Sequence, residues 1–191
     1  MGFVFGNITR IMTRYSHFDI LRSPTWDEKI SLSGSTLKEL SFWKEKIPSL
    51  NSRRLLSTQF HYSRVCYSDA SSTGCASYML DLHNTISYKL WGVDEAQKSS
   101  SYRELKAVFL GLESFLPLLK GRTIKWYTDN QSVARIVEVG SMKEDLQCLA
   151  LRIFSMCLLS CITLEIEWIP RSALLRLINT PQLVRNGVVK I

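Results

Sequence analysis

Short apolar runs separated by polar turn residues follow one another between residues 61 and 91, and this pattern predicts β-strands. We expect strands at Val65–Ser68, Thr73–Leu80 and Thr85–Trp91, with His83 and Asn84 in the turn between the last two. Three strands that follow each other through such short turns predict an antiparallel meander.

The next stretch has the period of an amphipathic helix. We expect this helix to open at Ser101 and to stop at Gly121, with Pro117 distorting its last turn. Its apolar face consists of Tyr102, Leu105, Phe109, Leu112, Leu116 and Leu119. The apolar run that follows, Thr123–Thr128, predicts a fourth strand.

Two helices and a last strand complete the regular part of the chain. A short helix over Val133–Val137 closes at Gly140, and a longer helix begins at about Lys143. Apolar and polar residues alternate over Ile162–Trp168, which predicts a fifth strand. The order βββαβααβ predicts an α/β fold in which helices pack on a mixed five-stranded sheet.

The first 60 residues are less regular. No clear period exists over residues 1 to 30, whereas Ser35 and Thr36 offer a capped start for a helix near residues 36–47. This helix would place Leu37, Leu40 and Trp43 on one side and would end before Pro48. We therefore expect a connecting segment over residues 1–60, a domain over residues 61–171 and a basic tail over residues 172–191.

The net charge of +7 is unevenly distributed. Residues 1–60 carry nine basic and five acidic residues, residues 61–169 carry eleven and twelve, and residues 170–191 carry four and none. The basic excess therefore lies in the flanks, outside the regular part of the chain. It is compatible with a polyanionic partner and equally with a device for solubility.

Cysteine usage and hydropathy bear on the compartment. The five cysteines form no CxxC pair and no zinc-binding spacing, which favours a reducing compartment, cytoplasm or nucleus. The chain begins with no basic segment of a signal peptide, and Gln147 and Arg152 interrupt the long apolar run of Leu146–Leu164. We expect no membrane-spanning segment.

Three acidic residues stand at the edges of these elements: Asp69 after the first strand, Glu104 in the first helix and Asp129 after the fourth strand. A carboxylate is costly to bury unless it binds something, so three at such places indicate a metal cluster if they converge. Each also has a plainer interpretation. Asp69 could begin a turn, Glu104 could close a capping box with Ser101, and Asp129 or Asn130 could cap a helix.

Four motifs in this order resemble the ribonuclease H region of retrotransposon polyproteins, with the closer similarity to elements of the DIRS type. The motifs are Ser68-Asp69-Ala70-Ser71 with Gly74 shortly after, Ser101-Tyr102-Arg103-Glu104-Leu105, Tyr127-Thr128-Asp129-Asn130 and Trp168-Ile169-Pro170-Arg171. The resemblance implies a ribonuclease H-like fold over residues 61–171. It also implies cleavage of the RNA strand of an RNA:DNA hybrid by two divalent ions, Mg²⁺ or in its place Mn²⁺, held by Asp69, Glu104 and Asp129. The helix near residues 36–47 resembles the segment that joins ribonuclease H to a reverse transcriptase.

The chain departs from this family after Arg171. The family has a fourth metal-binding Asp in a closing helix, whereas this chain contains no acidic residue after Glu167. We expect the closing helix to be lost or altered and cleavage to be weak or absent, with partial rescue by Mn²⁺. Two alternatives stay open: a catalytically inactive module that binds nucleic acid, and a truncated product without a stable function.

Candidate contacts to nucleic acid lie beside the three acids. The resemblance points to Ser71, Ser72, Asn130 and Gln131 for the hybrid, although each could be an ordinary turn residue. Arg171, together with Arg53 and Arg54, would add attraction to phosphates that is independent of base sequence.

Overall fold

The computed structural model describes residues 7–50, 62–80, 85–173 and 188–190. A mixed sheet forms its centre, with the strand order β5-β4-β1-β2-β3-β6. The predicted meander is present, because β1 pairs antiparallel with β2 and β2 antiparallel with β3, whereas β4 and β5 join in parallel on the other side of β1. The first five strands are β1 Arg64–Ala70, β2 Gly74–Met79, β3 Thr85–Leu90, β4 Thr123–Thr128 and β5 Thr163–Trp168. The predicted α/β class and its five strands are confirmed.

A sixth strand, which the sequence pattern did not predict, lies at the other edge of the sheet. This strand, β6 Val188–Lys190, pairs in parallel with β3 from Ile86 to Tyr88. Three residues are too few for a recognisable alternation, so such a strand has no signature in the sequence. The expected turn at His83 and Asn84, the arginines Arg53 and Arg54, and the altered closing helix lie outside the described residues.

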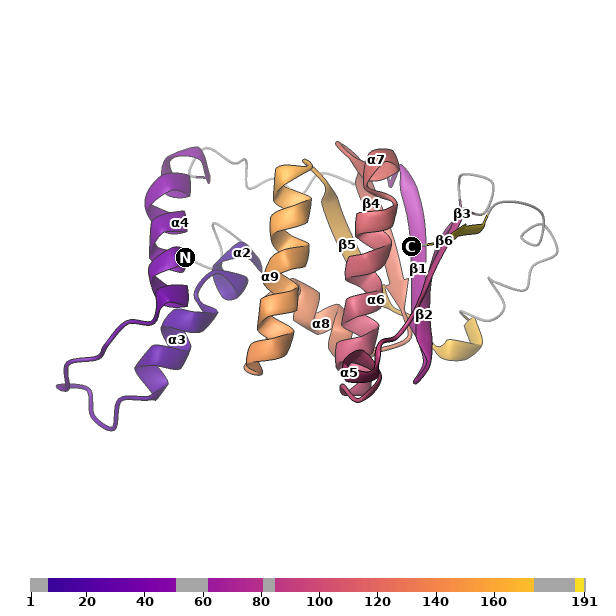
Figure 1. The fold of residues 1–191 in the computed structure, drawn as a ribbon. Helices are drawn as coiled ribbons and strands as arrows, with labels where there is room; N and C mark the ends of the chain where they lie inside the picture. Colours follow the sequence, from indigo (N-terminus) through magenta and orange to yellow (C-terminus); the bar gives the residue numbers. More distant parts are fainter. Residues whose placement is uncertain (1–6, 51–61, 81–84, 174–187, 191) are drawn as a thin grey trace.

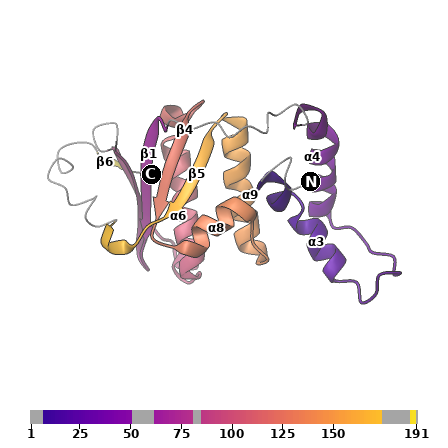
Figure 2. The same cartoon turned by 180° about the vertical axis from the view of Figure 1, so that it is seen from behind.

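Helices cover one face of the sheet, as the two opposite views show (Figure 1, Figure 2). The helix α6 packs on β1 and β2 and also against α9. Leu105, Val108 and Leu112 of α6 meet Trp126 of β4 and Ile153 of α9 in the largest buried cluster. The helices here are α5 Val93–Ala96, α6 Ser100–Ser114, α7 Leu116–Leu119, α8 Gln131–Val139 and α9 Glu144–Leu159.

A glycine allows α6 to approach the sheet closely. A Cβ atom added at Gly111 would lie 2.4 Å from the hydroxyl oxygen of Ser77 and 2.7 Å from the ring of Trp126. The Ser77 hydroxyl donates to the carbonyl of Ala107 one turn earlier, so the sheet and the helix are also joined by a buried hydrogen bond. This packing fixes the height of α6 over β1 and β2, and with it the position of the first turn of α6.

The single helix expected from Ser101 to Leu119 is divided at Phe115, which ends α6 and precedes α7. The physical reason is Pro117, which has no N–H to donate and whose ring crowds the preceding turn. The sequence indicated a distortion at this proline, and the structure places the break two residues before it.

Three helices lie within the described residues 7–50: α2 Asn7–Ile11, α3 Arg14–Leu21 and α4 Gly34–Leu50. They lie beside α9, at the end of the molecule away from β6 (Figure 1). The expected helix near residues 36–47 is present, but it continues through Pro48. The expected apolar side is wrong for Leu37 and Leu40, which are about half exposed, at 51% and 47%, whereas Thr36 and Glu39 are buried. Trp43 is half-buried, and its indole N–H donates to the carbonyl of Met12.

Two buried acids join α3 to α4. The carboxylate of Glu39, on α4, accepts hydrogen bonds from the backbone N–H groups of Tyr15 and Ser16 in the first turn of α3. The carboxylate of Asp19, on α3, accepts from the N–H of Ser33 and the hydroxyl of Thr36 at the start of α4. Each helix therefore supplies an acceptor to the beginning of the other, and the Ser33 hydroxyl also caps α4 by accepting from the N–H of Thr36. None of the helices described has a long enough apolar stretch to cross a membrane.

Candidate metal centre

Asp69 and Asp129 come together because their strands are parallel neighbours. Ser68 in β1 is paired with Thr128 in β4, so the residue that follows in each strand lies at the same edge of the sheet. Asp69 is still within β1, and Asp129 comes directly after β4. The sheet register thus brings together two acids that lie far apart in the sequence.

Glu104 reaches this edge from α6. One carboxylate oxygen, Oε1, accepts a hydrogen bond of 3.2 Å from the backbone N–H of Ala70, the residue after Asp69. One ligand oxygen from each of Asp69, Glu104 and Asp129 lies within 4.8 Å of the others. The three predicted acids therefore converge.

The caps of α6 and α8 exclude the plainer interpretations of Glu104 and Asp129 as capping residues. Ser99, not Ser101, is the N-cap of α6, and it accepts from the N–H of Tyr102, so Glu104 does not close a capping box with Ser101. Asn130 caps α8 by accepting from the N–H of Val133. The carboxylate of Asp129 is therefore directed to the cluster and not to the cap.

The cluster holds more negative charge than its surroundings compensate. Burial first, and then the carboxylates of Asp69 and Asp129, raise the pKa of Glu104 to about 8. Burial and the carboxylate of Asp69 also raise the pKa of Asp129. Acids that resist ionisation in this way are stabilised in their charged form by a nearby cation.

One buried oxygen at this site has no protein partner. Glu104 is only 5% exposed, and its second oxygen, Oε2, makes no hydrogen bond although it is inaccessible to solvent. A buried acceptor without a donor is costly, and carboxylate oxygens are the ligands that Mg²⁺ and Mn²⁺ prefer. The donor set and its unsatisfied oxygen thus fit a hard divalent cation.

Arg171 lies beside the same acids. Its guanidinium nitrogens are 3.8 Å from an oxygen of Asp69 and 3.9 Å from an oxygen of Asp129. The indole N–H of Trp168 donates to the backbone carbonyl of Asp129, which ties the end of β5 to the site. The sequence pointed to Arg171 as a phosphate contact, but its pairing with the two aspartates was not foreseen. No sequence signal indicates it, because the pairing depends on how β5 lies beside β4.

The other predicted contacts differ in their surroundings. Ser71 lies in the turn after β1, where its hydroxyl accepts from the N–H groups of Thr73 and Gly74, and Ser72 beside it is exposed. Asn130 uses its side-chain oxygen as the cap of α8, and Gln131 is exposed at the start of that helix. Of the four predicted contacts, Ser71 and Asn130 are thus used in a turn and in a helix cap. Ser72 and Gln131 have exposed side chains without such a hydrogen bond in the described structure.

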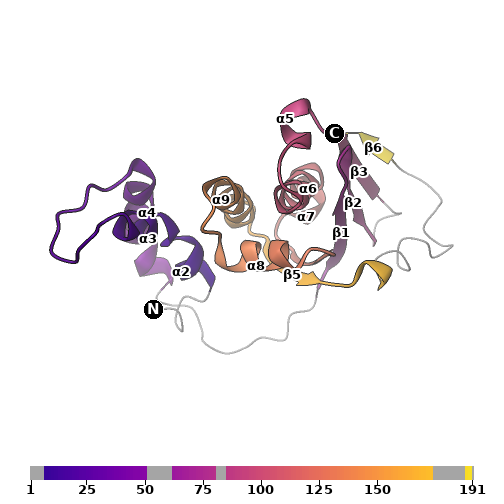
Figure 3. The ribbon, with the colours of Figure 1, turned by 90° about the horizontal axis from the view of Figure 1, so that it is seen from below.

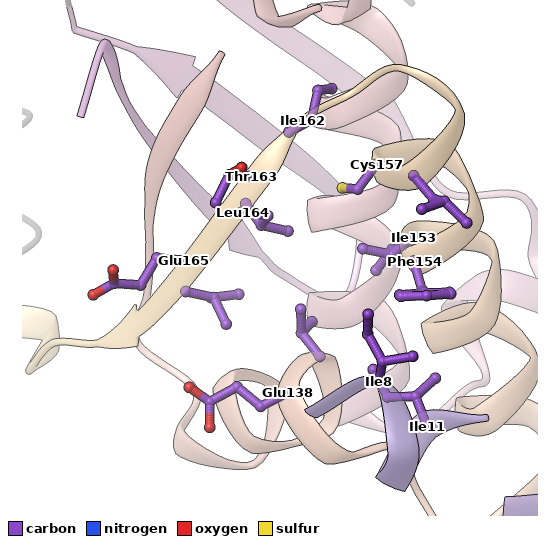
Figure 4. Close-up of a pocket in the computed structure, with 13 residues that line it drawn as sticks. Ile8, Ile11, Glu138, Ile153, Phe154, Cys157, Ile162, Thr163, Leu164 and Glu165 are labelled. Atoms are coloured by element: carbon purple, nitrogen blue, oxygen red, sulfur yellow. The ribbon is translucent and has the colours of Figure 1, made fainter. Parts of the chain in front are cut away.

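An apolar cavity in the described part of the chain lies elsewhere (Figure 4). It measures about 400 Å³ and is enclosed by α2, α8, α9 and β5, with Ile8, Ile153 and Leu164 among its lining residues. Glu138 and Glu165 at its rim are the ionisable carboxylates that line it. Nothing in this lining suggests a reaction, so the candidate site is the acid cluster.

Neither a protein-family model nor a curated protein matches the chain. Among solved structures, RNase H1 of the halophilic archaeon Halobacterium salinarum is similar, at 13% identity and a TM-score of 0.47 over 58% of this chain and 87% of that one. LC11-RNase H1, solved in complex with an RNA/DNA hybrid, is similar at 15% identity and a TM-score of 0.49, over 60% and 90% of the two chains. The foamy viral protease-reverse transcriptase, also with an RNA/DNA hybrid, is similar at 16% identity and 0.45, over 83% of this chain and 26% of that one. Likenesses at this level carry no information on what this chain binds or cleaves.

Proposed function

We propose that this chain is a ribonuclease H-like domain that binds divalent metal ions at Asp69, Glu104 and Asp129 and cleaves the RNA strand of an RNA:DNA hybrid. The observation that carries the proposal is the convergence of the three acids within 4.8 Å, with a buried Glu104 oxygen that lacks a partner. The four sequence motifs that resemble retrotransposon ribonuclease H supply the substrate class.

The three acids would have different tasks. Glu104 is buried and anchored to the N–H of Ala70, so it can hold an ion in a fixed position. The side chain of Asp69 is more exposed than that of Asp129, so it can face the substrate. Its strand β1 contacts both β4 and α6, so its two oxygens could be shared between two metal ions. Divalent ions bound here would supply an activated water and would stabilise the leaving oxygen of the phosphodiester.

Mg²⁺ is the expected ion and Mn²⁺ a possible substitute. Both are hard cations that accept carboxylate oxygens, and Mn²⁺ binds the same donor set more tightly. The chain contains no acidic residue after Glu167, so a fourth carboxylate from the C-terminal side is absent from the sequence. We therefore expect weak cleavage with Mg²⁺ and stronger cleavage with Mn²⁺.

The origin of the domain belongs to the same proposal. The Trp168-Ile169-Pro170-Arg171 motif and the helices before residue 61 support descent from a retrotransposon polyprotein of the DIRS type or a related element. In that polyprotein residues 1–60 would connect a reverse transcriptase to the ribonuclease H-like domain of residues 61–171. The basic tail of residues 172–191 would stand where the family has its closing helix.

A second candidate function is a module that binds nucleic acid without cleaving it. The pairing of Arg171 with Asp69 and Asp129 favours it, because a cation of the protein itself partly neutralises the cluster. The absence of a fourth acid from the sequence points in the same direction. Binding and cleavage must therefore be measured separately.

The test is incubation of the pure protein with an end-labelled RNA:DNA hybrid in Mg²⁺ or in Mn²⁺. We expect cleavage of the RNA strand that Asp69→Asn abolishes and Asp94→Asn, at an exposed acid of α5, leaves intact. Binding by the unaltered protein without cleavage in either ion would support the second candidate. The same low cleavage in all three proteins would indicate a contaminating nuclease, and no binding at all would refute both functions.

A further inference from the structure

A basic pocket lies between the N-terminal helices and α8, away from the three acids. It has a volume of about 510 Å³, and Arg10, Arg14, His17 and Arg135 supply its charged and ionisable side chains. We propose that this basic pocket binds a backbone phosphate of the nucleic acid whose binding the proposed function requires. The interface would then extend from the acid cluster onto the helices that precede the domain.

The positive charge of the basic pocket is not neutralised by the protein. Within the part of the chain that the structure describes, none of its three arginines forms an ion pair with a carboxylate. The two buried acids of these helices are engaged elsewhere, because Glu39 accepts from Tyr15 and Ser16 and Asp19 accepts from Ser33 and Thr36. Glu138 of α8 lines the apolar cavity instead (Figure 4).

The hydroxyl groups of the basic pocket are already used. The Thr13 hydroxyl donates to the carbonyl of Thr9, and the Ser16 hydroxyl donates to Glu39. The groups left to meet a ligand are therefore the exposed guanidinium groups of Arg10 and Arg135 and the exposed ring of His17. Such a set selects an anion, and guanidinium groups in particular match the oxygens of a phosphate.

In the described structure, Arg14 is the one arginine of the basic pocket whose guanidinium the fold holds in place. Its Nη2 donates to the carbonyl of Val139 at 2.5 Å and its Nη1 approaches the sulfur of Met142 at 3.4 Å, so it ties α3 to the end of α8. Its Nε is buried without a hydrogen-bond partner. The charge of Arg14 is thus fixed by the fold and adds to the positive potential of the basic pocket, whereas Arg10 and Arg135 are the arginines that would contact the ligand.

The distance from the acid cluster suits one continuous ligand. α8 begins two residues after Asp129 and lies between the sheet and α2, as the view from below shows (Figure 3). At about 1.5 Å per residue, Arg135 lies roughly 9 Å and Val139 roughly 15 Å along the helix from Asp129. Each strand of a duplex carries one charge per about 3.4 Å of its axis, so a strand that runs from the acids along α8 would bring a phosphate to the basic pocket within roughly three to five nucleotides.

The test compares hybrid binding of matched variants in an Asp69→Asn background, where the labelled hybrid stays intact. We expect the pair Arg10→Ala and Arg135→Ala to weaken binding about tenfold at low salt and to lower the slope of log K against log salt by about one to two. The control pair, Lys29→Ala and Lys44→Ala, removes the same charge from exposed positions elsewhere and should change binding less than twofold. Arg14 is left unchanged because it holds α8.

The outcomes separate the two claims. Equal binding by the arginine pair and its parent would overturn the basic pocket while leaving the proposed function intact. An equal loss in the lysine pair would also overturn it, because the effect would then follow net charge alone. A parent that binds no hybrid would overturn the proposed function and this inference together. Circular dichroism melts confirm that each variant is folded.

Discussion

At the scale of single residues, Glu104 has an unusual environment for a carboxyl group. It is a buried carboxyl beside two other carboxyls, with one oxygen hydrogen-bonded and the other without a partner. A side chain in this position opposes folding when it is ionised and no cation is present. Its role is therefore visible in stability measurements as well as in activity.

Metal-free protein should lose stability as the pH rises. The pKa of Glu104 is raised from 4.5 to about 8, first by burial and then by its acidic neighbours. A raised folded-state pKa contributes stability that is fully present below the unfolded value and is lost as the pH passes the folded one. We expect the free energy of unfolding in EDTA, measured with urea, to fall by up to about 4 kcal/mol between pH 5 and pH 9.

Glu104→Gln is the control for this prediction, because an amide does not titrate. Its unfolding free energy should depend less on pH over the same interval, and the difference between the two proteins is the quantity to compare. Mg²⁺ should restore the stability of the unaltered protein at high pH, since metal binding requires the ionised carboxylate. The same pH dependence in both proteins would show that Glu104 is not the group responsible.

Arg171 should compete with the metal. Its guanidinium lies beside Asp69 and Asp129, although its side chain is 70% exposed, so the repulsion of a second cation is screened by solvent. We expect Arg171→Gln to lower the dissociation constant for Mn²⁺ about threefold to fivefold, measured by titration calorimetry. Arg122→Gln, which removes an exposed arginine elsewhere, should have no effect. Unchanged or weaker Mn²⁺ binding in Arg171→Gln would mean that Arg171 supports the site and does not compete for it.

At the scale of secondary-structure elements, α3 and α4 depend on each other. The first turn of a helix has N–H groups without partners, and Thr13, the N-cap of α3, makes no side-chain cap; its hydroxyl donates to the carbonyl of Thr9. Glu39 of α4 supplies the acceptor for two of these N–H groups. Thr36 and Glu39 lie on the buried side of α4, so apolar residues at helical spacing do not mark this side, and Leu37 and Leu40 are exposed instead.

Glu39→Ala should destabilise the protein. Two backbone N–H groups and one hydroxyl would lose their acceptor, and the expected loss is about 2–3 kcal/mol of unfolding free energy, measured with urea. Glu45→Ala, at an exposed acid of the same helix, should change it by less than about 0.5 kcal/mol. If both variants have equal stability, the hydrogen bonds of Glu39 contribute nothing to the coupling of the two helices.

The strands were easier to predict than the helical N-terminal segment, because the signals for strands lie in consecutive residues of the sequence. The strands β1 to β5 carry alternating or continuous apolar residues, and the turns that bound them contain recognisable residues. The acid cluster was also predictable, because its members lie at the ends of those strands and in the first helix. Three other features were not predictable: the position of Arg171 beside the acids, the hydrogen bonds of Glu39 and Asp19 between α3 and α4, and the basic pocket. Each joins residues from different elements, and local periodicity does not encode the contacts between such elements.

At the scale of the whole molecule, charges of opposite sign are separated. The acid cluster lies at one edge of the sheet, and unpaired arginines lie on the N-terminal helices and α8. Nucleic acid would be attracted to the basic side and repelled at the acids unless cations neutralise them. Binding and metal loading should therefore depend on each other.

Removal of the metal should weaken binding to nucleic acid even where nothing is cleaved. A DNA duplex of the same sequence as the hybrid has no RNA strand to cut, so its binding can be followed by fluorescence anisotropy in Mg²⁺ and in EDTA at equal ionic strength. We expect binding about tenfold weaker in EDTA, or about 1.4 kcal/mol. Asp69→Asn, Glu104→Gln and Asp129→Asn combined should abolish this difference, because the neutral cluster no longer repels phosphate. An equal effect of EDTA on the triple variant would place the metal dependence elsewhere, whereas no effect on either protein would mean that the acids lie outside the path of the duplex.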